Sequence, residues 1–214
     1  MDRIVLSNVV PQVFADKNMA YSDIWNKEVS FHKGKKYLIE AASGTGKSSL
    51  GSFIYGYRKD YNGTICFDSQ DISGMGIQQW IDIRKNHLGM LFQELRLFTE
   101  LTAMENIELK NNLTHTRTRA EIDSWMNRLG IADKANQMVG RMSFGQQQRV
   151  AFIRALCQPV DFLFMDEPVS HLDKNNGMLM SDILDEEIHN TGMGVIITSI
   201  GHHVDMDYSM NLKL

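Results

Sequence analysis

The sequence has few prolines and cysteines, and it contains no repeat, low-complexity tract or obvious linker. Only Pro11, Pro159 and Pro168 interrupt its 214 residues, so we expect one domain, or one domain with an inserted lobe. The two cysteines, Cys66 and Cys157, lie far apart and show no metal-binding spacing. They fit a reducing compartment, and we expect both to be small buried side chains.

The chain also lacks a long apolar run and a strong excess of either charge. No run approaches the roughly 18 residues that a membrane-spanning helix needs, so another chain would supply that part of any membrane complex. Asp2 and Arg3 open a strand-like N-terminus, so we expect no signal peptide. The net charge of −4 includes no large basic excess, which argues against nucleic acid as the main partner.

The composition is ordinary for a soluble globular protein, and the order of its segments predicts the α/β class. Apolar residues make up 43% and charged residues 22%, and the length allows a substantial core. Short β-rich runs alternate with helical segments, which predicts a largely parallel sheet. Lys33-Gly34 and Asn62-Gly63 resemble hairpin turns, so a small antiparallel sheet is expected beside it. The predicted strands are Ile4–Val10, Val29–His32, Tyr37–Glu40, Thr64–Phe67, Leu88–Phe92, Phe162–Met165 and Val195–Thr198.

Residues from about 95 to 139 differ from the rest of the chain. Their pattern is helical, most clearly in Met104–Asn112 and Arg119–Leu129, and it contains no convincing strand. We therefore predict a single domain in which this segment forms a helical lobe, inserted into a core of residues 1–94 and 140–214.

A phosphate-binding loop is predicted where a strand-like run, Tyr37–Ile39, gives way to a helix-like one, Ser48–Tyr55. Gly44 and Gly46 let the backbone curl so that successive N–H groups point at phosphates, and the following helix adds its positive N-terminal end. The predicted nucleotide-binding residues are Ser43, Gly44, Thr45, Gly46, Lys47, Ser48 and Ser49. This loop predicts binding of a nucleoside triphosphate.

Lys47 and Ser48 carry the chemistry of this loop. Lys47 is expected to reach the β- and γ-phosphates, and the Ser48 hydroxyl to ligate Mg²⁺. Ala41 stands where the usual pattern begins with glycine, and alanine is tolerated there if its φ is negative. The alternative interpretation is a Gly/Ser turn with an exposed lysine.

A second candidate element is the apolar strand Phe162–Met165, which ends in two acids. Acidic groups at the end of a buried strand are costly unless a cation or polar chemistry lies there. We expect Asp166 to hold the Mg²⁺ shell through water and Glu167 to orient the attacking water or accept its proton. The alternative is an acidic turn after a core strand.

A third element resembles a known family. The segment Met142-Ser143-Phe144-Gly145-Gln146-Gln147-Gln148-Arg149 resembles the signature loop of ATP-binding cassette (ABC) ATPases, usually Leu-Ser-Gly-Gly-Gln. Gln93 resembles the family's Q-loop glutamine, and Ser170-His171-Leu172-Asp173 resembles its D-loop. Lys47 and Gln93 are 46 residues apart, Gln93 and Ser143 are 50 apart, and Ser143 and Asp166 are 23 apart. The order and spacing match over nearly the whole chain.

The resemblance implies an ATP site that one chain cannot complete. In this family two cassettes bind head to tail with two ATP molecules between them. Ser143, Gly145 and Gln146 of one copy would then contact the γ-phosphate held by Lys47 of the other. A hydroxyl, backbone N–H groups and a helix N-terminus suit an anion.

Other roles also follow from the resemblance. Gln93 would join the Mg²⁺ shell and sense the γ-phosphate, and Asp173 would couple the two sites. An aromatic ring normally stacks on adenine near the end of the first strand, and Phe14 is the candidate, with Tyr21 and Trp25 behind it. Any of these three rings can equally be part of the core.

The chain departs from the family pattern at two further positions. Phe144 replaces the usual first glycine of the signature pair, and Ser199-Ile200 stands where the family has Thr-His. An isoleucine cannot hydrogen-bond the γ-phosphate. His202 is the candidate to take that place through a shifted loop; alternatively, His202 and His203 are surface residues of a turn. These departures bear on the rate of hydrolysis more than on ATP binding.

The segment Leu91–Ile107 is similar to that of the lipoprotein-releasing, macrolide-efflux and cell-division ATPases of the family. The chain ends at Leu214, soon after its last strand-like run, so no added regulatory domain is expected. The resemblance implies a homodimeric ATPase subunit on the cytoplasmic face of the cell membrane, driving a separate permease-type subunit. The cargo is not identified.

Two alternatives remain open. A weakly hydrolysing or non-hydrolysing ATP-gated clamp is favoured by Phe144 and Ile200 and opposed by Glu167. A soluble ABC ATPase of DNA repair or chromosome handling would carry a long coiled coil between Q-loop and signature, where this chain has only 50 residues between Gln93 and Ser143.

Overall fold

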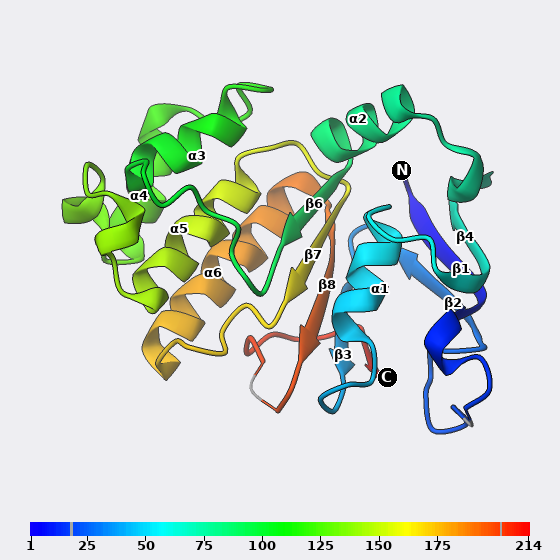
Figure 1. The fold of residues 1–214 in the computed structure, drawn as a ribbon. Helices are drawn as coiled ribbons and strands as arrows, with labels where there is room; N and C mark the ends of the chain where they lie inside the picture. Colours follow the sequence, from blue (N-terminus) through cyan, green and yellow to red (C-terminus); the bar gives the residue numbers. More distant parts are fainter. Residues whose placement is uncertain (18, 202) are drawn as a thin grey trace.

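Two sheets and the helices around them make up the fold (Figure 1). The computed structural model describes residues 1–17, 19–201 and 203–214. A five-stranded parallel sheet has the order β6-β7-β8-β3-β9, and a four-stranded antiparallel sheet has the order β2-β1-β4-β5. The prediction of a parallel sheet beside a small antiparallel sheet is confirmed. The strands are β1 Arg3–Pro11, β2 Glu28–His32, β3 Lys36–Glu40, β4 Tyr61–Phe67, β5 Gln70–Asp71, β6 Leu88–Leu91, β7 Phe162–Asp166, β8 Gly194–Ser199 and β9 Met210–Lys213.

Helices cover both faces of the parallel sheet. Helix α1 lies between the two sheets, and α5 and α6 lie on the opposite face (Figure 1). The helices are α1 Lys47–Ile54, α2 Ile77–Asn86, α3 Ala103–Asn111, α4 Arg119–Arg128, α5 Phe144–Leu156 and α6 Lys174–Thr191, with short 3₁₀ turns η1 Gln12–Phe14, η2 Ile72–Gly74, η3 Ala132–Lys134 and η4 Val139–Arg141. Within the described ranges, no helix combines the length and apolar composition that crossing a bilayer requires.

The parallel strands are apolar on both faces because both faces are covered. Leu163 and Met165 of β7 belong to a cluster formed with α5 and α6, whereas Phe162 and Phe164 belong to a second cluster formed with α1 and the antiparallel sheet. Strand β7 is buried along its whole length. Asp166, its last residue, and Glu167, which follows it, are therefore carried by a rigid element.

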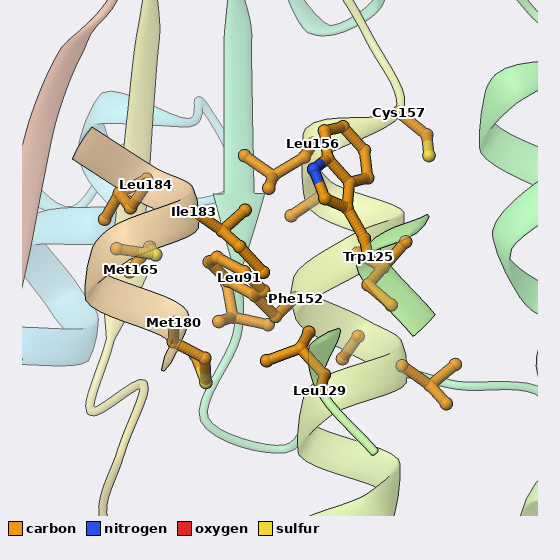
Figure 2. Packing of buried hydrophobic residues seen from close by; sticks show 14 of the residues in the cluster. Leu91, Trp125, Leu129, Phe152, Leu156, Cys157, Met165, Met180, Ile183 and Leu184 are labelled. Carbon is orange, nitrogen blue, oxygen red and sulfur yellow. The ribbon is translucent and has the colours of Figure 1, made fainter. Parts of the chain in front are cut away.

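Figure 2 shows the first cluster, where side chains of α5, α6 and the sheet meet those of α4. Its labelled members are Leu91, Trp125, Leu129, Phe152, Leu156, Cys157, Met165, Met180, Ile183 and Leu184. Cys157 is fully buried, as predicted, and burial raises the pKa of its thiol to about 12. Cys66 is only half-buried, and both cysteines are free thiols.

The segment between β6 and α5 is helical, and its helices α3 and α4 lie beyond α5 from the sheet (Figure 1). Helices α3 and α4 each begin with a capping box: Thr102 with Glu105, and Thr118 with Glu121. The described part of residues 95–139 contains an isolated bridge between Thr102 and Met138, but no strand. The boundaries of a separate lobe remain a prediction.

The two predicted hairpin turns are wrong. Gly34 turns the chain with φ +74°, but β2 and β3 on either side of it enter different sheets. Asn62 and Gly63 lie inside β4, where Gly63 has φ +91° and a Cβ on it would come within 2.3 Å of the Asn8 carbonyl oxygen. The register of β1 and β4 shifts here because Asn8 and Val9 of β1 lie opposite Gly63 alone, so this turn-like dipeptide lies opposite a β-bulge in β1.

Asp161, just before β7, is surrounded by cations and should make stability depend on acid pH. Burial opposes ionisation of this carboxyl, but its hydrogen bonds outweigh burial and lower its pKa to about 2. The donors are Lys33, the Met1 ammonium group and the His87 ring. A lowered folded-state pKa means that the stabilisation is present above the unfolded-state pKa of about 3.9 and is lost as pH falls toward 2.

We expect Asp161→Asn to lower the free energy of unfolding by about 2 kcal/mol at pH 7, with the difference shrinking below pH 4. Urea unfolding at several pH values would measure this. The control is Asp123→Asn, which breaks an exposed pair with Arg119 and should have little effect. A constant difference between pH 2 and 7 would contradict the prediction.

Candidate nucleotide-binding site

The phosphate-binding loop lies at the carboxyl edge of the parallel sheet, between β3 and α1 (Figure 1). Gly44 and Gly46 have φ of +80° and +102°, a left-handed backbone that favours glycine. A Cβ on Gly46 would lie 3.0 Å from the Trp25 ring and 3.3 Å from Phe14, so the loop also packs too closely for a side chain. Ala41 is not among the described residues with positive φ, which meets the condition for alanine there.

Trp25 supports this loop from beneath. Its indole Nε1 donates a hydrogen bond to the Thr45 carbonyl oxygen at 2.9 Å, its ring is fully buried, and it packs edge-on against Phe53 of α1. Trp25 is therefore unavailable for stacking on adenine, and its role is to hold the loop. The sequence contained no signal for this contact, because it depends on the packing of β1 and the loop after it against α1.

Asp166 ends β7 and receives two hydroxyl hydrogen bonds. The Ser48 hydroxyl donates to Oδ2 at 2.8 Å, and the Thr198 hydroxyl, from β8, donates to Oδ1 at 2.5 Å. Asp166 is only 3% exposed, so these bonds orient a buried carboxylate toward the loop. Thr198 was missed by the sequence reasoning, since a threonine inside an apolar strand carries no recognisable pattern.

Glu167 follows β7 in an unusual backbone conformation. Its φ is +51°, which costs a residue other than glycine about 1–3 kcal/mol, and its N–H bonds the Thr198 carbonyl at 3.1 Å. Its Oε1 lies 3.5 Å from the Lys47 Nζ, and the two side chains are only 11% and 7% exposed. The strained backbone thus places the carboxylate over the phosphate loop, beside a largely buried ammonium group.

A pocket of about 340 Å³ opens above the loop. Its lining residues come from the loops after four neighbouring strands of the sheet, from the start of α1 and from the 3₁₀ turn η1. They are Phe14, Ser43, Gly44, Gly46, Lys47, Ser48, Ser49, Gln93, Glu167 and Ile200. The loops that follow β3, β6, β7 and β8 meet here because parallel strands share one carboxyl edge. Thr45 contributes differently, since its hydroxyl donates to the Ala42 carbonyl at 2.9 Å and closes the turn.

The remaining candidates for stacking on adenine, Phe14 and Tyr21, differ in their position relative to the pocket. Phe14, at the end of η1, forms a half-buried wall of the pocket, and the Lys17 ammonium lies 4.8 Å from its ring centroid. Tyr21 is 59% exposed and its hydroxyl contacts the Met19 sulfur. Phe14 is therefore the candidate that the structure leaves beside the phosphate loop.

The signature residues lie outside this pocket. Ser143 caps α5: its hydroxyl accepts from the Gln146 N–H at 3.4 Å, and its own N–H donates to the Gln146 side chain at 3.0 Å. Phe144 is 43% exposed and packs edge-on against His171, with 4.6 Å between ring centroids. A Cβ on Gly145 would lie 3.4 Å from the His171 carbonyl oxygen. The signature and the D-loop therefore form one surface of the chain.

Asp173, the predicted coupling residue, caps α6. Its carboxylate accepts from the Asn176 N–H at 2.8 Å, and hydrogen bonds from Asn176 lower the pKa of Asp173. The carboxylate thus has a local structural role, and coupling between two sites stays a prediction.

Ile200, just after β8, stands where the family pattern has a histidine. Ile200 is 46% exposed and lines the pocket, where its side chain offers no hydrogen bond. The predicted substitute, His202, lies outside the residues that the structure describes. The His203 ring packs on Tyr208, 5.8 Å away, and lines a different hollow with Asp205.

The donor set can be compared with what Mg²⁺ requires. Among the described residues, no group of three or more histidine, cysteine or acidic side chains forms a protein-only metal cage. Ser48 and Asp166 instead offer one hydroxyl and one carboxylate beside the phosphate loop. This fits Mg²⁺, which keeps several waters and is bound by one or two protein groups together with substrate phosphates.

Comparison with known proteins gives a consistent result. The sequence profile of the family described as ABC transporter matches residues 25–170. The macrolide export ATP-binding/permease protein MacB of Shewanella sp. (strain ANA-3) is 35% identical over 182 residues, which cover 82% of this chain and 27% of that protein. The ABC transporter ATP-binding protein YtrE of Bacillus subtilis is 30% identical over 184 residues, covering 81% and 80%.

The solved structures agree with the sequence relatives. The dimeric structure of MJ0796, a bacterial ABC transporter cassette, matches with a TM-score of 0.76 and 25% identity over 91% of this chain and 87% of that one. A post-hydrolysis state of MJ0796 bound to ADP and Pi matches with a TM-score of 0.73 and 26% identity. This chain spans about a quarter of the length of the MacB relative, and nearly all of a single cassette. Because the profile extends over more than half of its 214 residues, the chain belongs to the ABC transporter family.

Proposed function

We propose that this chain binds and hydrolyses MgATP as the cassette subunit of an ABC transporter-type complex. The observation that carries the proposal is the meeting of Lys47, Ser48, Glu167 and Asp166 at one sheet edge, around a loop built to present N–H groups. The relatives support it, since MacB is named an ATP-binding/permease protein and a dimer of MJ0796 has been solved with ADP and Pi.

Each residue of the site has a physical task in this reaction. The loop N–H groups and Lys47 would bind the β- and γ-phosphates, and Phe14 would contact the adenine. Ser48, Asp166 through water, and Gln93 would hold Mg²⁺, which when bound neutralises charge on the phosphate oxygens. A buried lysine paired with Glu167 is ready to exchange that partner for phosphate.

Glu167 is the proposed general base. The water oxygen forms a bond to the γ-phosphorus as the bond from that phosphorus to the β–γ bridging oxygen breaks, and the electron pair leaves with ADP. The proton of the water passes to Glu167 and from there to phosphate. The buried position of Glu167, 3.5 Å from Lys47, fits a base that acts beside a bound phosphate.

We propose that the active form is a head-to-tail homodimer. Ser143, Gly145 and Gln146 do not line the pocket of their own chain, within the residues described, yet Ser143 is exposed at a helix N-terminus. That surface suits a γ-phosphate held by a second copy. Asp173 lies beside it and would then couple the two sites.

The membrane partner is also part of the proposal. We expect a separate integral permease-type subunit, which would hold this cassette at the cytoplasmic face of the membrane. We further propose that residues 95–139 form the lobe that contacts it, inserted in the core of residues 1–94 and 140–214. The MacB relative is named an ATP-binding/permease protein, which supports the pairing of this cassette with a permease-type subunit.

One observation favours a second candidate, an ATP-gated clamp that hydrolyses slowly or not at all. Ile200 occupies the pocket wall without offering a hydrogen bond to phosphate. The measured kcat of the complex decides between the two, because ATP binding is common to both.

The direct test of ATP binding is Lys47→Ala. We expect the affinity for MgATP to fall by at least about 100-fold, since a charge-assisted contact to phosphate is lost and Glu167 is left without its buried partner. Isothermal titration calorimetry would measure it. Lys134→Ala, which removes a partly exposed ammonium paired with Asp133, is the control and should bind normally. Unchanged affinity of Lys47→Ala would refute the assignment of the loop.

A further inference from the structure

His171 is an exposed histidine that the site described above does not use. His171, in the loop between β7 and α6, is exposed, and its ring meets Phe144 edge-on at 4.6 Å and 75°. Its carbonyl oxygen lies against Gly145. The imidazole therefore belongs to the same surface as Ser143. We call Ser143, Phe144, Gly145 and His171 the signature patch.

The loop that carries His171 is held firmly. The Ser170 hydroxyl and N–H both donate to the Glu167 carbonyl, at 3.2 and 3.4 Å. Buried Gln148 of α5 donates to the carbonyls of Glu167 and Pro168, at 3.4 and 2.5 Å. These bonds tie the loop to the end of β7 and to the signature helix, so the imidazole is positioned by rigid elements.

A second set of contacts joins the N-terminal ends of α5 and α6, which lie on either side of the signature patch. Arg149 of α5 donates to the Gly145 carbonyl at 3.1 Å and to the Asn176 side chain at 3.0 Å. Asn176 is in turn bonded to the cap residue Asp173. Helices α5 and α6 therefore present the signature patch as one preorganised surface, which is the condition for useful electrostatic stabilisation.

Among the described residues, the part of the phosphate pocket at the end of β8 lacks a hydrogen-bond donor, and the signature patch can supply one. Its wall at the end of β8 is Ile200, which has no donor. His203 packs on Tyr208 and lines another hollow. Among the residues that the structure describes, a γ-phosphate in the pocket would thus meet Lys47, Ser48, Gln93 and Glu167, but only the aliphatic Ile200 at the end of β8.

We propose that His171 supplies the missing donor across the dimer interface. The proposal rests on the head-to-tail dimer proposed above, in which the signature patch faces the phosphate loop of the other copy. There the imidazole N–H would donate to a γ-phosphate oxygen held by the partner's Lys47, opposite the partner's Ile200. Each ATP would then be completed by a histidine of the other chain.

A donor at this position would stabilise charge that develops during hydrolysis. As water bonds to the γ-phosphorus and ADP departs with the electron pair, negative charge is spread over the γ-oxygens. His171 forms and breaks no covalent bond and gives up no proton; its N–H remains on the ring and stabilises the oxygens. The structural alternative is that His171 only packs against Phe144, and the test must separate the two roles.

His171→Phe makes this separation, because a phenyl ring can keep the edge-on packing while losing the nitrogens. In the purified chain, with its membrane subunit where one co-purifies, we expect kcat to fall by about 10- to 100-fold, as for the loss of one oxyanion donor. The KM for ATP should stay within about threefold. The control is His189→Phe, an exposed histidine near the far end of α6, about 22 Å of helix away from Lys174. Turnover of His171→Phe equal to that of the control would overturn the proposal.

Mixed dimers test whether the histidine acts in the other chain. We would mix His171→Phe with Glu167→Gln before adding MgATP. In a mixed pair, the pocket of the His171→Phe chain keeps its own Glu167 and receives an intact His171 from its partner. The expected activity is about half that of a parallel mixture of wild type with Glu167→Gln, because the parallel mixture also contains wild-type homodimers. A mixture as inactive as its two components would overturn the proposal.

A rescue variant asks whether the lost group is a phosphate donor. Adding Ile200→His to the His171→Phe chain places an imidazole on the pocket wall of the same chain. We expect most of the lost turnover to return; continued loss with normal ATP affinity would overturn the assigned role. If the wild type shows neither turnover nor ATP-dependent dimers, the proposed function falls together with this inference. If the wild type turns over normally and His171→Phe does too, only the inference falls.

Discussion

Replacing Glu167 by glutamine is expected to lower the turnover of MgATP by about 10²- to 10⁴-fold, the range for loss of a general base. The change removes the carboxylate but keeps its shape, so the left-handed backbone at φ +51° and the N–H bond to the Thr198 carbonyl can persist. ATP binding should survive, because Lys47 loses a competing anion 3.5 Å away and remains free for phosphate. A steady-state phosphate-release assay measures the first effect and calorimetry the second.

The same variant should favour the dimer. With ATP bound and not hydrolysed, the proposed contact between Ser143 of one copy and the nucleotide of the other would persist. Size-exclusion chromatography with light scattering should then show a dimer with MgATP and a monomer with ADP. Glu100→Gln, at an exposed carboxylate hydrogen-bonded to Thr99, is the control for turnover. Normal activity of Glu167→Gln would show that another group is the base, and a monomer at saturating ATP would contradict the sandwich.

Trp25→Ala should be the most destabilising single change at the site, lowering the free energy of unfolding by about 3–5 kcal/mol. The ring is fully buried, and its removal leaves a large cavity and an unpaired Thr45 carbonyl under the phosphate loop. Against a typical total of about 5–15 kcal/mol, this is a large share of stability. Urea unfolding followed by circular dichroism would measure it.

The specific role of Trp25 is tested by comparison with Trp125. Trp125 is also buried, in the cluster around α5 and α6 and away from the loop, so Trp125→Ala should destabilise by a similar amount (Figure 2). Only the Trp25 variant should weaken the binding of MgATP to the folded fraction. Trp25→Phe keeps most of the packing and removes the Nε1 bond, so it should lose about 1 kcal/mol or somewhat more. Equal ATP affinity in both alanine variants would contradict the supporting role.

The local shape of the phosphate loop followed from residue type and spacing, whereas the chemical roles of its residues stay predictions. Gly44 and Gly46 adopt the left-handed conformations that the loop requires, and Lys47 and Ser48 line the pocket with Gln93 and Glu167. A loop between a strand and a helix has few alternative shapes, so local sequence is sufficient to predict it.

The errors arose where one local pattern serves two structures. Asn62-Gly63 has the composition of a hairpin turn, but a glycine with positive φ also fits opposite a β-bulge, where the backbone at Asn8 comes close, and the partner strand decides between them. Strand β9 was not predicted, because Met210–Lys213 is short and only Leu212 is buried in it. It forms by adding to the edge of β3, a contact far away in sequence.

The sequence by itself indicated the family, the phosphate loop and the acids at the end of β7, because these depend on residue types at set spacings. Tertiary structure alone decided that Trp25 holds the loop, that Thr198 and Ser48 orient Asp166, and that His171 lies against the signature helix. The reason is physical: each of these contacts joins elements brought together by the parallel order of the strands and by packing on α1, α5 and α6. No local pattern records which side chains will meet there.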